Sequence, residues 1–141
     1  MEDNWYYLYV VFEEMYSYRF LYRNLTDLLD RYPGLKKRFR QIMGLKRDAL
    51  VAIWNTLSRE SELEVEADEV EALIDNMVLL LSYWINYDHL LRDERPPALS
   101  IHQGVYHLMT MIAPYLGEAQ WDFYAQVQLI YRQSLTAGPE E

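Results

Sequence analysis

Apolar residues recur along this chain at the spacing of α-helix faces, and short polar or Pro/Gly-containing stretches separate the periodic segments. The first segment runs over about residues 4–23. A short helix over 26–31 follows, and then a long helix over about 34–57, whose first turn suits Pro33. At 100° per residue, one face of the first segment carries Trp5, Leu8, Tyr9, Phe12, Met15, Tyr16 and Phe20.

The second half of the chain continues the helical pattern. An acidic connection over residues 58–66 precedes a central helix that ends near residue 91, and Asp68 with Glu71 resembles a capping box at its start. Helices over about 98–113 and 117–135 complete the series, and no strand pattern competes with them. The pattern predicts an all-α fold, an orthogonal bundle of about five to seven helices. Residues 1–136 would form a single domain, and residues 137–141 a polar tail.

Composition agrees with one well-packed domain. The 141 residues are 51% hydrophobic and 15% aromatic, which is ample core material for this length. Met1 is followed by Glu2 and Asp3, where a signal peptide would carry basic residues. The longest uncharged apolar stretch, around residues 77–85, is far shorter than the roughly 20 residues that a bilayer requires. We therefore expect a cytoplasmic protein without a membrane partner.

Candidate chemistry is sparse. Cysteine is absent, which removes disulfides, thiolate nucleophiles and zinc–thiolate sites. His102 and His107 lie about 140° apart around a helix and cannot share a metal, while His89 stands on another segment. No catalytic or nucleotide-binding motif occurs. We expect no catalytic residue, no metal and no cofactor, and hence no enzyme; a cofactor-free enzyme that uses a tyrosine or histidine in an aromatic cavity is a weaker alternative.

Charge is distributed unevenly. The net charge of −9 opposes direct binding to nucleic acid, so the basic residues between Lys36 and Arg47 are interpreted as a solvated helix face. Between Pro96 and Gly138 only Glu118, Asp122 and Arg132 are charged. Two neighbouring helices with so little charge are expected to bury both faces.

This charge gap predicts a homodimer through residues of about 98–135, in a four-helix arrangement around a two-fold axis. In the last helix a second apolar stripe of Trp121, Ala125 and Leu129 lies nearly opposite the first. A monomer in which the two helices form the innermost layer is the alternative. The residues expected at the interface are Val105, Leu108, Met109, Ile112, Phe123, Val127, Ile130 and Tyr131.

A mixed face of the central helix combines aromatic and hydrogen-bonding side chains, as a small-molecule pocket requires. We expect this pocket between the first, third and central helices. Lys46, in the middle of an apolar face, would meet an anionic group of the ligand; the alternatives are a snorkelling lysine and a plain aromatic core. The expected ligand-binding residues are Trp5, Tyr9, Phe12, Tyr16, Lys46, Trp54, Asn76, Tyr83 and Tyr87.

Three runs resemble parts of a known family. The run RNLTDLLDRYPGLKKRFRQI, residues 23–42, is similar to a helix–turn–helix stretch in a subset of TetR/AcrR-family C-terminal domains. LLLSYWINY, residues 79–87, resembles the central helix of these domains, and GVYHLMTMIAPYL, residues 104–116, resembles their first dimerisation helix. Core positions rather than a catalytic signature carry this resemblance.

The resemblance implies an effector-binding and homodimerisation domain of a bacterial TetR-type transcriptional regulator. In such proteins a three-helix DNA-binding head precedes this domain, and ligand binding changes the spacing of the two heads in the dimer. No helix-turn-helix sequence stands before Trp5, so DNA contact is expected only through a missing N-terminal head. The expected effector is small and apolar or aromatic. A stand-alone helical adaptor that binds another protein is the alternative.

Overall fold

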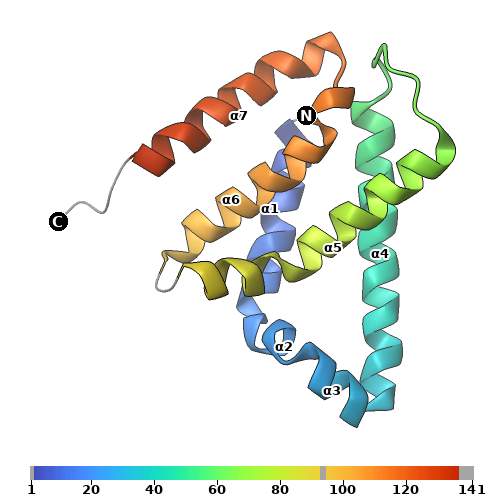
Figure 1. The fold of residues 1–141 in the computed structure, drawn as a ribbon, viewed down its shortest axis with the longest axis vertical. Coiled ribbons are helices and arrows are strands. Elements are labelled where there is room, and N and C mark those ends of the chain that lie inside the picture. The colour runs from blue at the N-terminus through green and yellow to red at the C-terminus, as the bar shows by residue number, and fades with distance from the viewer. Residues whose placement is uncertain (1, 93–94, 137–141) are drawn as a thin grey trace.

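Seven α-helices and one short 3-10 helix make up most of residues 2–92 and 95–136, the part of the chain that this computed structural model describes. These residues contain no strand, which confirms the all-α prediction. The predicted polar tail over residues 137–141 lies outside them. In chain order the elements are α1 (Glu2–Ser17), α2 (Arg19–Arg23), α3 (Leu25–Arg31), α4 (Pro33–Leu57), α5 (Ala67–Leu91), α6 (Pro97–Ile112), η1 (Ala113–Tyr115) and α7 (Glu118–Thr136) (Figure 1).

Most helix ends lie within two residues of their predicted positions, because prolines mark several of them. Pro33 occupies the first turn of α4, where a missing N–H costs no helix hydrogen bond. Pro97 begins α6, and Pro114 lies in the 3-10 turn that ends it. None of the helices in the described ranges has both the length and the hydropathy needed to cross a membrane.

The first predicted helix is divided in two, which corrects the predicted face. Tyr18 interrupts it with φ −102° and ψ 25°, so α1 ends at Ser17 and α2 begins at Arg19. The interruption changes the angular register of the following turn. As a result Phe20, predicted on the apolar face, is 64% exposed, and Tyr22 is buried in its place.

The start of α5 also differs from the prediction. Its N-cap residue is Glu66, which makes no side-chain capping bond. Asp68 lies inside the first turn, where its Oδ1 accepts a hydrogen bond from the Glu69 N–H at 3.0 Å. The expected capping box is therefore absent, and Asp68 with Glu69 places negative charge near the positive end of the helix dipole.

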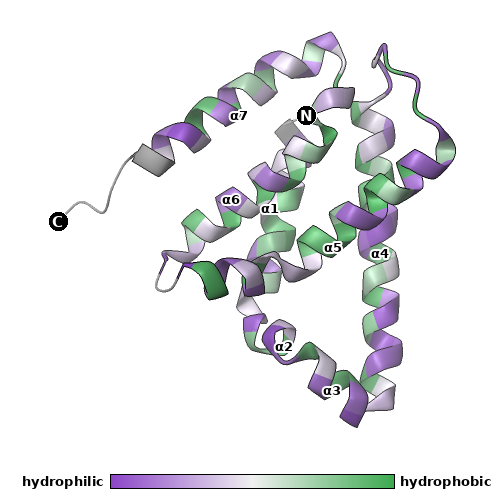
Figure 2. Cartoon of the chain, in the orientation of Figure 1, coloured by the Kyte–Doolittle hydropathy of each residue, from purple (hydrophilic) through white to green (hydrophobic). Residues whose placement is uncertain are grey.

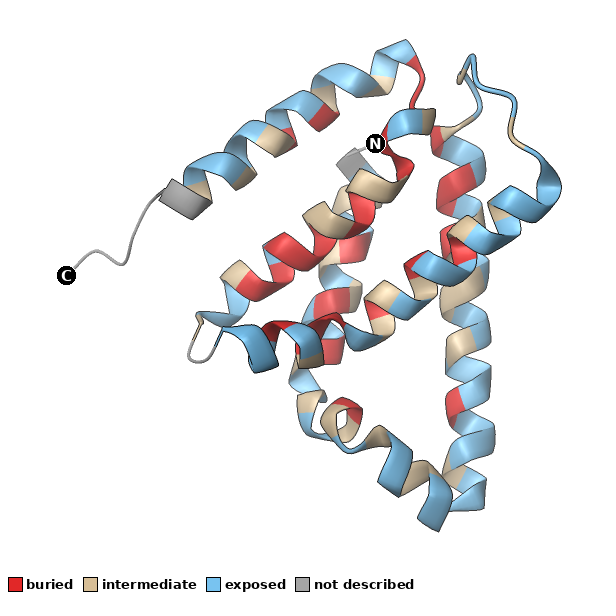
Figure 3. Cartoon of the chain, in the orientation of Figure 1, coloured by how far each residue is buried: buried red, intermediate tan, exposed pale blue. Residues whose placement is uncertain are grey.

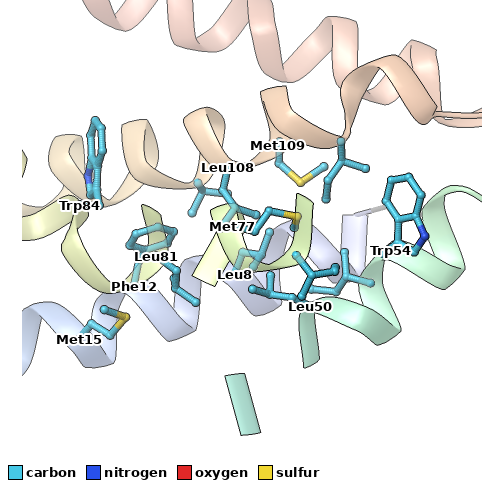
Figure 4. Packing of buried hydrophobic residues seen from close by; sticks show 14 of the residues in the cluster. Leu8, Phe12, Met15, Leu50, Trp54, Met77, Leu81, Trp84, Leu108 and Met109 are labelled. Carbon is cyan, nitrogen blue, oxygen red and sulfur yellow. The ribbon is translucent and has the colours of Figure 1, made fainter. Parts of the chain in front are cut away.

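Helix α6 is the centre of the core. It packs against α1 and α5 on one side and against α7 on the other (Figure 1). Buried positions run along its whole length, whereas the lower parts of α3 and α4 are mainly exposed (Figure 3). Figure 4 shows Leu108 and Met109 of α6 near Met77 of α5, with Phe12 of α1 in the same cluster. All four of these side chains are fully buried.

Gly104 permits the closest approach within this core. A Cβ atom at this position would lie 2.7 Å from Trp84 Cδ1 and 2.9 Å from Phe12 Cε1, distances that real Cβ atoms do not show. Beside it, the buried Trp84 indole N–H donates a hydrogen bond to the Ser100 carbonyl at 2.9 Å. The absence of a side chain at residue 104 thus lets α6 contact α1 and α5 at the same point.

Helix α7 packs chiefly against α6 and lies at the edge of the molecule (Figure 1). Tyr124 and Val127 on its inner side are buried. Its outer side is exposed (Figure 3) and carries apolar as well as polar residues (Figure 2). Among the apolar ones, Trp121 is 44% and Leu129 57% exposed.

The turn before α7 touches the acidic connection between α4 and α5. A Cβ atom at Gly117 would lie 2.7 Å from Glu60 Cβ and 3.0 Å from the Glu60 carbonyl oxygen. These two connections therefore meet at one end of the bundle.

Gly104→Ala tests the contact at the centre of the core. The new methyl group has no room against Trp84 and Phe12, so we expect the free energy of unfolding to fall by about 1–3 kcal/mol. Urea denaturation followed by circular dichroism measures it. The matched control is Gly44→Ala in α4, where no atom lies within 4 Å of the new Cβ and a gain of about 0.5–1 kcal/mol is expected. Similar changes in the two variants would contradict the packing described.

Candidate functional site

A groove between α5 and α6 brings together three of the predicted ligand-binding residues, Asn76, Tyr83 and Tyr87. Its volume is about 490 Å³, within the range of roughly 300–1,000 Å³ that is typical of small-molecule sites. Both tyrosines are about half exposed at its rim. The complete lining is Asn76, Leu79, Leu80, Tyr83, Trp84, Tyr87, His107 and Met111.

Aromatic rings form the floor of this groove. The Trp84 ring lies 5.9 Å from that of Tyr87 and 4.7 Å from that of His107, centroid to centroid. Burial, followed by the charge of Arg92, lowers the pKa of His107, and Asp88 opposes this shift. The imidazole is thus neutral at pH 7 and offers one hydrogen-bond donor and one acceptor. Apolar walls with these few polar groups suit a flat apolar or aromatic molecule.

The ring contacts continue from the groove into α7. The Tyr131 hydroxyl lies 3.5 Å from His107 Nε2, and the Tyr131 ring stacks on Tyr106 at 3.8 Å. Tyr106 is parallel to Tyr124 at 6.4 Å, and Tyr124 meets Trp121 edge-on at 5.5 Å. Burial raises the pKa of Tyr124 to about 12, so its hydroxyl stays protonated. A continuous set of aromatic contacts therefore links the groove to the outer side of α7.

Phe12 and Trp54, predicted to line a pocket between α1, α4 and α5, are core side chains, which corrects the expectation for these two residues. Phe12 is fully buried, and Trp54 is 6% exposed and packs edge-on against Tyr115 at 5.0 Å. Figure 4 shows Phe12 beside Leu81, and Leu50 near Leu8. Large apolar side chains at these positions pack against one another and leave no wall of Phe12 and Trp54 for a ligand.

The other predicted residues of α1 face different surroundings. Trp5 lines a cavity of about 570 Å³ between α1, α6 and α7. The Tyr9 ring contacts that of His102 at 4.8 Å. Tyr16 lines a smaller cavity of about 250 Å³ beside Asp88. These three side chains therefore do not share one site with the α5–α6 groove.

The α6 half of the predicted dimer interface belongs to the core of a single chain. Val105, Leu108, Met109 and Ile112 are each 0% exposed without any partner. They are therefore revised from interface to core, because α6 buries its two sides against α1 and α5 and against α7.

The predicted interface residues of α7 differ among themselves. Val127 is buried, Phe123 and Tyr131 are partly buried, and Ile130 is 64% exposed. An uncovered apolar surface therefore remains on α7.

Lys46 lies apart from the groove, in a cleft between α1 and α4. Its Nζ donates a hydrogen bond to the Tyr22 hydroxyl at 2.7 Å and lies 3.5 Å from Met15 Sδ. Burial lowers the pKa of Lys46 to about 8.

Sequence reasoning missed two polar residues that line a larger cavity, of about 590 Å³, between α2–α3 and α5. Asn86 Nδ2 donates to the Tyr22 carbonyl at 2.9 Å, whereas Asn86 Oδ1 and Arg23 Nε are buried without a hydrogen-bond partner. The position of Asn86 three residues after Tyr83 is the one signal in the sequence, since this spacing places both near one face of α5.

Within residues 2–92 and 95–136, no three His, Asp or Glu side chains gather as a possible metal-ligand set. The buried Asp88 carboxylate instead pairs with Arg92 and Arg95, each at 2.9 Å. These ion pairs connect the end of α5 to Arg95, just before α6, so the cluster has a structural role.

Comparison with known proteins identifies a family. The family model described as "TetR: Bacterial transcriptional repressor" matches residues 1–123. No curated protein and no solved structure matches the chain.

His107 and His102 make the stability of the fold depend on pH. Burial lowers the pKa of both, so below their usual value of about 6.5 the unfolded chain binds more protons than the folded one. This contribution to stability is present above that pH and is lost as the pH falls. His107→Gln should therefore lose less stability than the wild type between pH 7.5 and 5.5, as measured by urea denaturation. His102→Gln measures the contribution of the other histidine in the same way. Equal losses of stability in the wild type and in His107→Gln would contradict the assignment of this pH dependence to His107.

Proposed function

This chain belongs to the TetR family of bacterial transcriptional repressors, and we propose that it is the effector-binding and homodimerisation domain of such a regulator. In this proposal a small apolar or aromatic molecule binds in the α5–α6 groove. DNA is contacted by a separate head domain of the regulator, and the domain itself catalyses no reaction.

The observation that carries the proposal is the aromatic groove and its ring contacts with α7. The groove offers apolar area for affinity, and Asn76 and His107 offer polar atoms that orient a ligand. A ligand against Trp84 also touches the ring network that reaches Tyr131 of α7 through His107. A ligand in this groove is therefore close to the helix proposed to form the dimer.

The outer face of α7 supports a second copy as its partner. Trp121 and Leu129 are 44% and 57% exposed on the outer side of a helix whose inner side is already packed, and Ile130, about 100° from Leu129 around the same helix, is 64% exposed. Large apolar side chains left uncovered together are typical of an interface. When two copies meet through the same helix, the contact closes around a two-fold axis, as in most homodimers. These exposed residues of α7 thus replace the α6 residues in the proposed interface.

Charge supports the assignment of DNA contact to another domain. The chain carries 22 acidic and 13 basic residues, and a surface of net negative charge repels phosphates. The effector then acts through the dimer. It shifts the arrangement of the two copies only if it binds one arrangement more tightly than the other.

Leu129→Glu combined with Ile130→Glu tests the proposed interface. Two carboxylates at these exposed positions of α7 would be desolvated on association, so we expect a monomer of 17.0 kDa where the wild type is a dimer of twice that mass. Size-exclusion chromatography with light scattering measures the mass. Leu63→Glu, at a position that is 56% exposed in the α4–α5 connection, is the matched control and should remain dimeric. A monomeric wild type would instead favour a helical adaptor that binds another protein through α7.

Tyr87→Ala tests the groove. In a thermal-shift screen of neutral aromatic compounds, a ligand at 100 times its dissociation constant adds about 2.7 kcal/mol to the stability of the wild type. Tyr87→Ala removes one wall of the groove and should reduce the shift, while Tyr32→Ala, at a position that is 58% exposed and outside the groove, should keep it. If both variants respond like the wild type, the ligand binds elsewhere.

A further inference from the structure

A cleft of about 360 Å³ between α1 and α4 carries a cation in apolar surroundings. Val10, Ile42 and Leu45 line it and are 36%, 45% and 69% exposed, and Tyr7 and Tyr18 extend the same surface. Lys46 lies in this lining, on α4. The cleft is separate from the α5–α6 groove, with which it shares no residue.

The Lys46 ammonium is held by neutral groups. Of its three N–H donors, one is directed at the Tyr22 hydroxyl at 2.7 Å and another at Met15 Sδ at 3.5 Å. The nitrogen also lies 4.7 Å from the centroid of the Tyr22 ring. Tyr22 and Met15 are themselves 8% and 3% exposed. The side chain is therefore turned toward the core, in contrast to a snorkelling lysine whose ammonium reaches open water.

No carboxylate neutralises this cation within ion-pair distance in the described part of the chain. Glu14 lines the same cleft but is exposed and makes no ion pair with Lys46. A partly desolvated ammonium without a counter-charge raises the free energy of the folded protein, and a bound anion would offset that cost. The cleft therefore combines one cationic donor with an exposed apolar surface on which a hydrocarbon chain can pack.

We propose that this cleft binds an amphiphilic monocarboxylic acid, whose carboxylate accepts a charge-assisted hydrogen bond from Lys46 and whose apolar tail lies along Val10, Ile42 and Leu45. A single cationic donor suits one negative charge. The carboxylate of Glu14 at the same cleft disfavours ligands with two, such as phosphate monoesters. The site does not depend on the groove or on the proposed dimer.

Binding of such an acid depends on pH in one direction. The titratable groups that face the cleft are Tyr7, Glu14 and the helix-junction Tyr18, together with Tyr22 of α2 and Lys46 of α4. The pKa of Lys46 is about 8, so its ammonium is charged at pH 7 and mostly neutral at pH 9.5. Affinity for the acid is thus highest below pH 8 and falls as the pH rises through that value.

Isothermal titration calorimetry with decanoate and decanol on the full chain tests the site. Wild-type protein should bind decanoate more tightly than decanol at pH 7, and Lys46→Met should weaken decanoate binding roughly tenfold to a hundredfold, the usual worth of a charge-assisted hydrogen bond. Decanol binding should change little, because methionine keeps the apolar volume. Lys37→Met, at an exposed position outside the cleft on the same helix, is the matched control and should bind decanoate like the wild type.

Urea denaturation verifies that Lys46→Met is folded. Calorimetric titration of the wild type with decanoate and decanol at pH 7 and at pH 9.5 provides a second readout, which needs no variant. Loss of the preference for decanoate at pH 9.5 supports the site. Equal losses for decanoate and decanol in Lys46→Met, or a preference that persists at pH 9.5, would overturn it. Tyr87→Ala, which alters the α5–α6 groove, should leave decanoate binding unchanged, so failure of this site and failure of the groove are distinguishable.

Discussion

The fold depends on one close contact, where Trp84 of α5 and Phe12 of α1 lie against the bare backbone of Gly104 in α6. Because no side chain separates the helices there, the indole N–H reaches the Ser100 carbonyl and fixes α5 against α6. The same indole also lines the groove, beside Tyr87 and His107. The contact that stabilises the core therefore also positions the aromatic surface proposed to bind the effector.

The helices and their ends were predictable from the sequence, because amphipathic spacing and proline positions are local properties of the chain. The partner of each apolar face is not local, and here the predictions were less successful. The scarcity of charge in α6 predicted a covered surface correctly, but its cover is α1, α5 and α7 of the same chain rather than a second copy. The break at Tyr18 left no signal in the spacing and redirected Phe20 to solvent.

The candidate site was predicted only in part for a similar reason. Asn76, Tyr83 and Tyr87 share one face of a single helix, so helical spacing was enough to group them, and the structure brings them together in the groove. Phe12 and Trp54 have the same chemical character but lie in the core. Residue type alone does not distinguish an aromatic side chain that packs from one that lines a cavity, since both bury apolar area. Lys46 stood out in the sequence because a charge within an apolar stripe is conspicuous, but its partners Tyr22 and Met15 come from other helices and were not predictable.

The contact between Glu60 and Gly117 joins the two connections at one end of the bundle. Since the space there does not admit even a methyl group, the acidic connection and the first turn of α7 cannot slide past each other freely. The connection between α4 and α5 therefore packs directly against the beginning of α7. The outermost helix of the bundle is consequently held at two places, by its aromatic contacts along α6 and by this tight contact at its first turn.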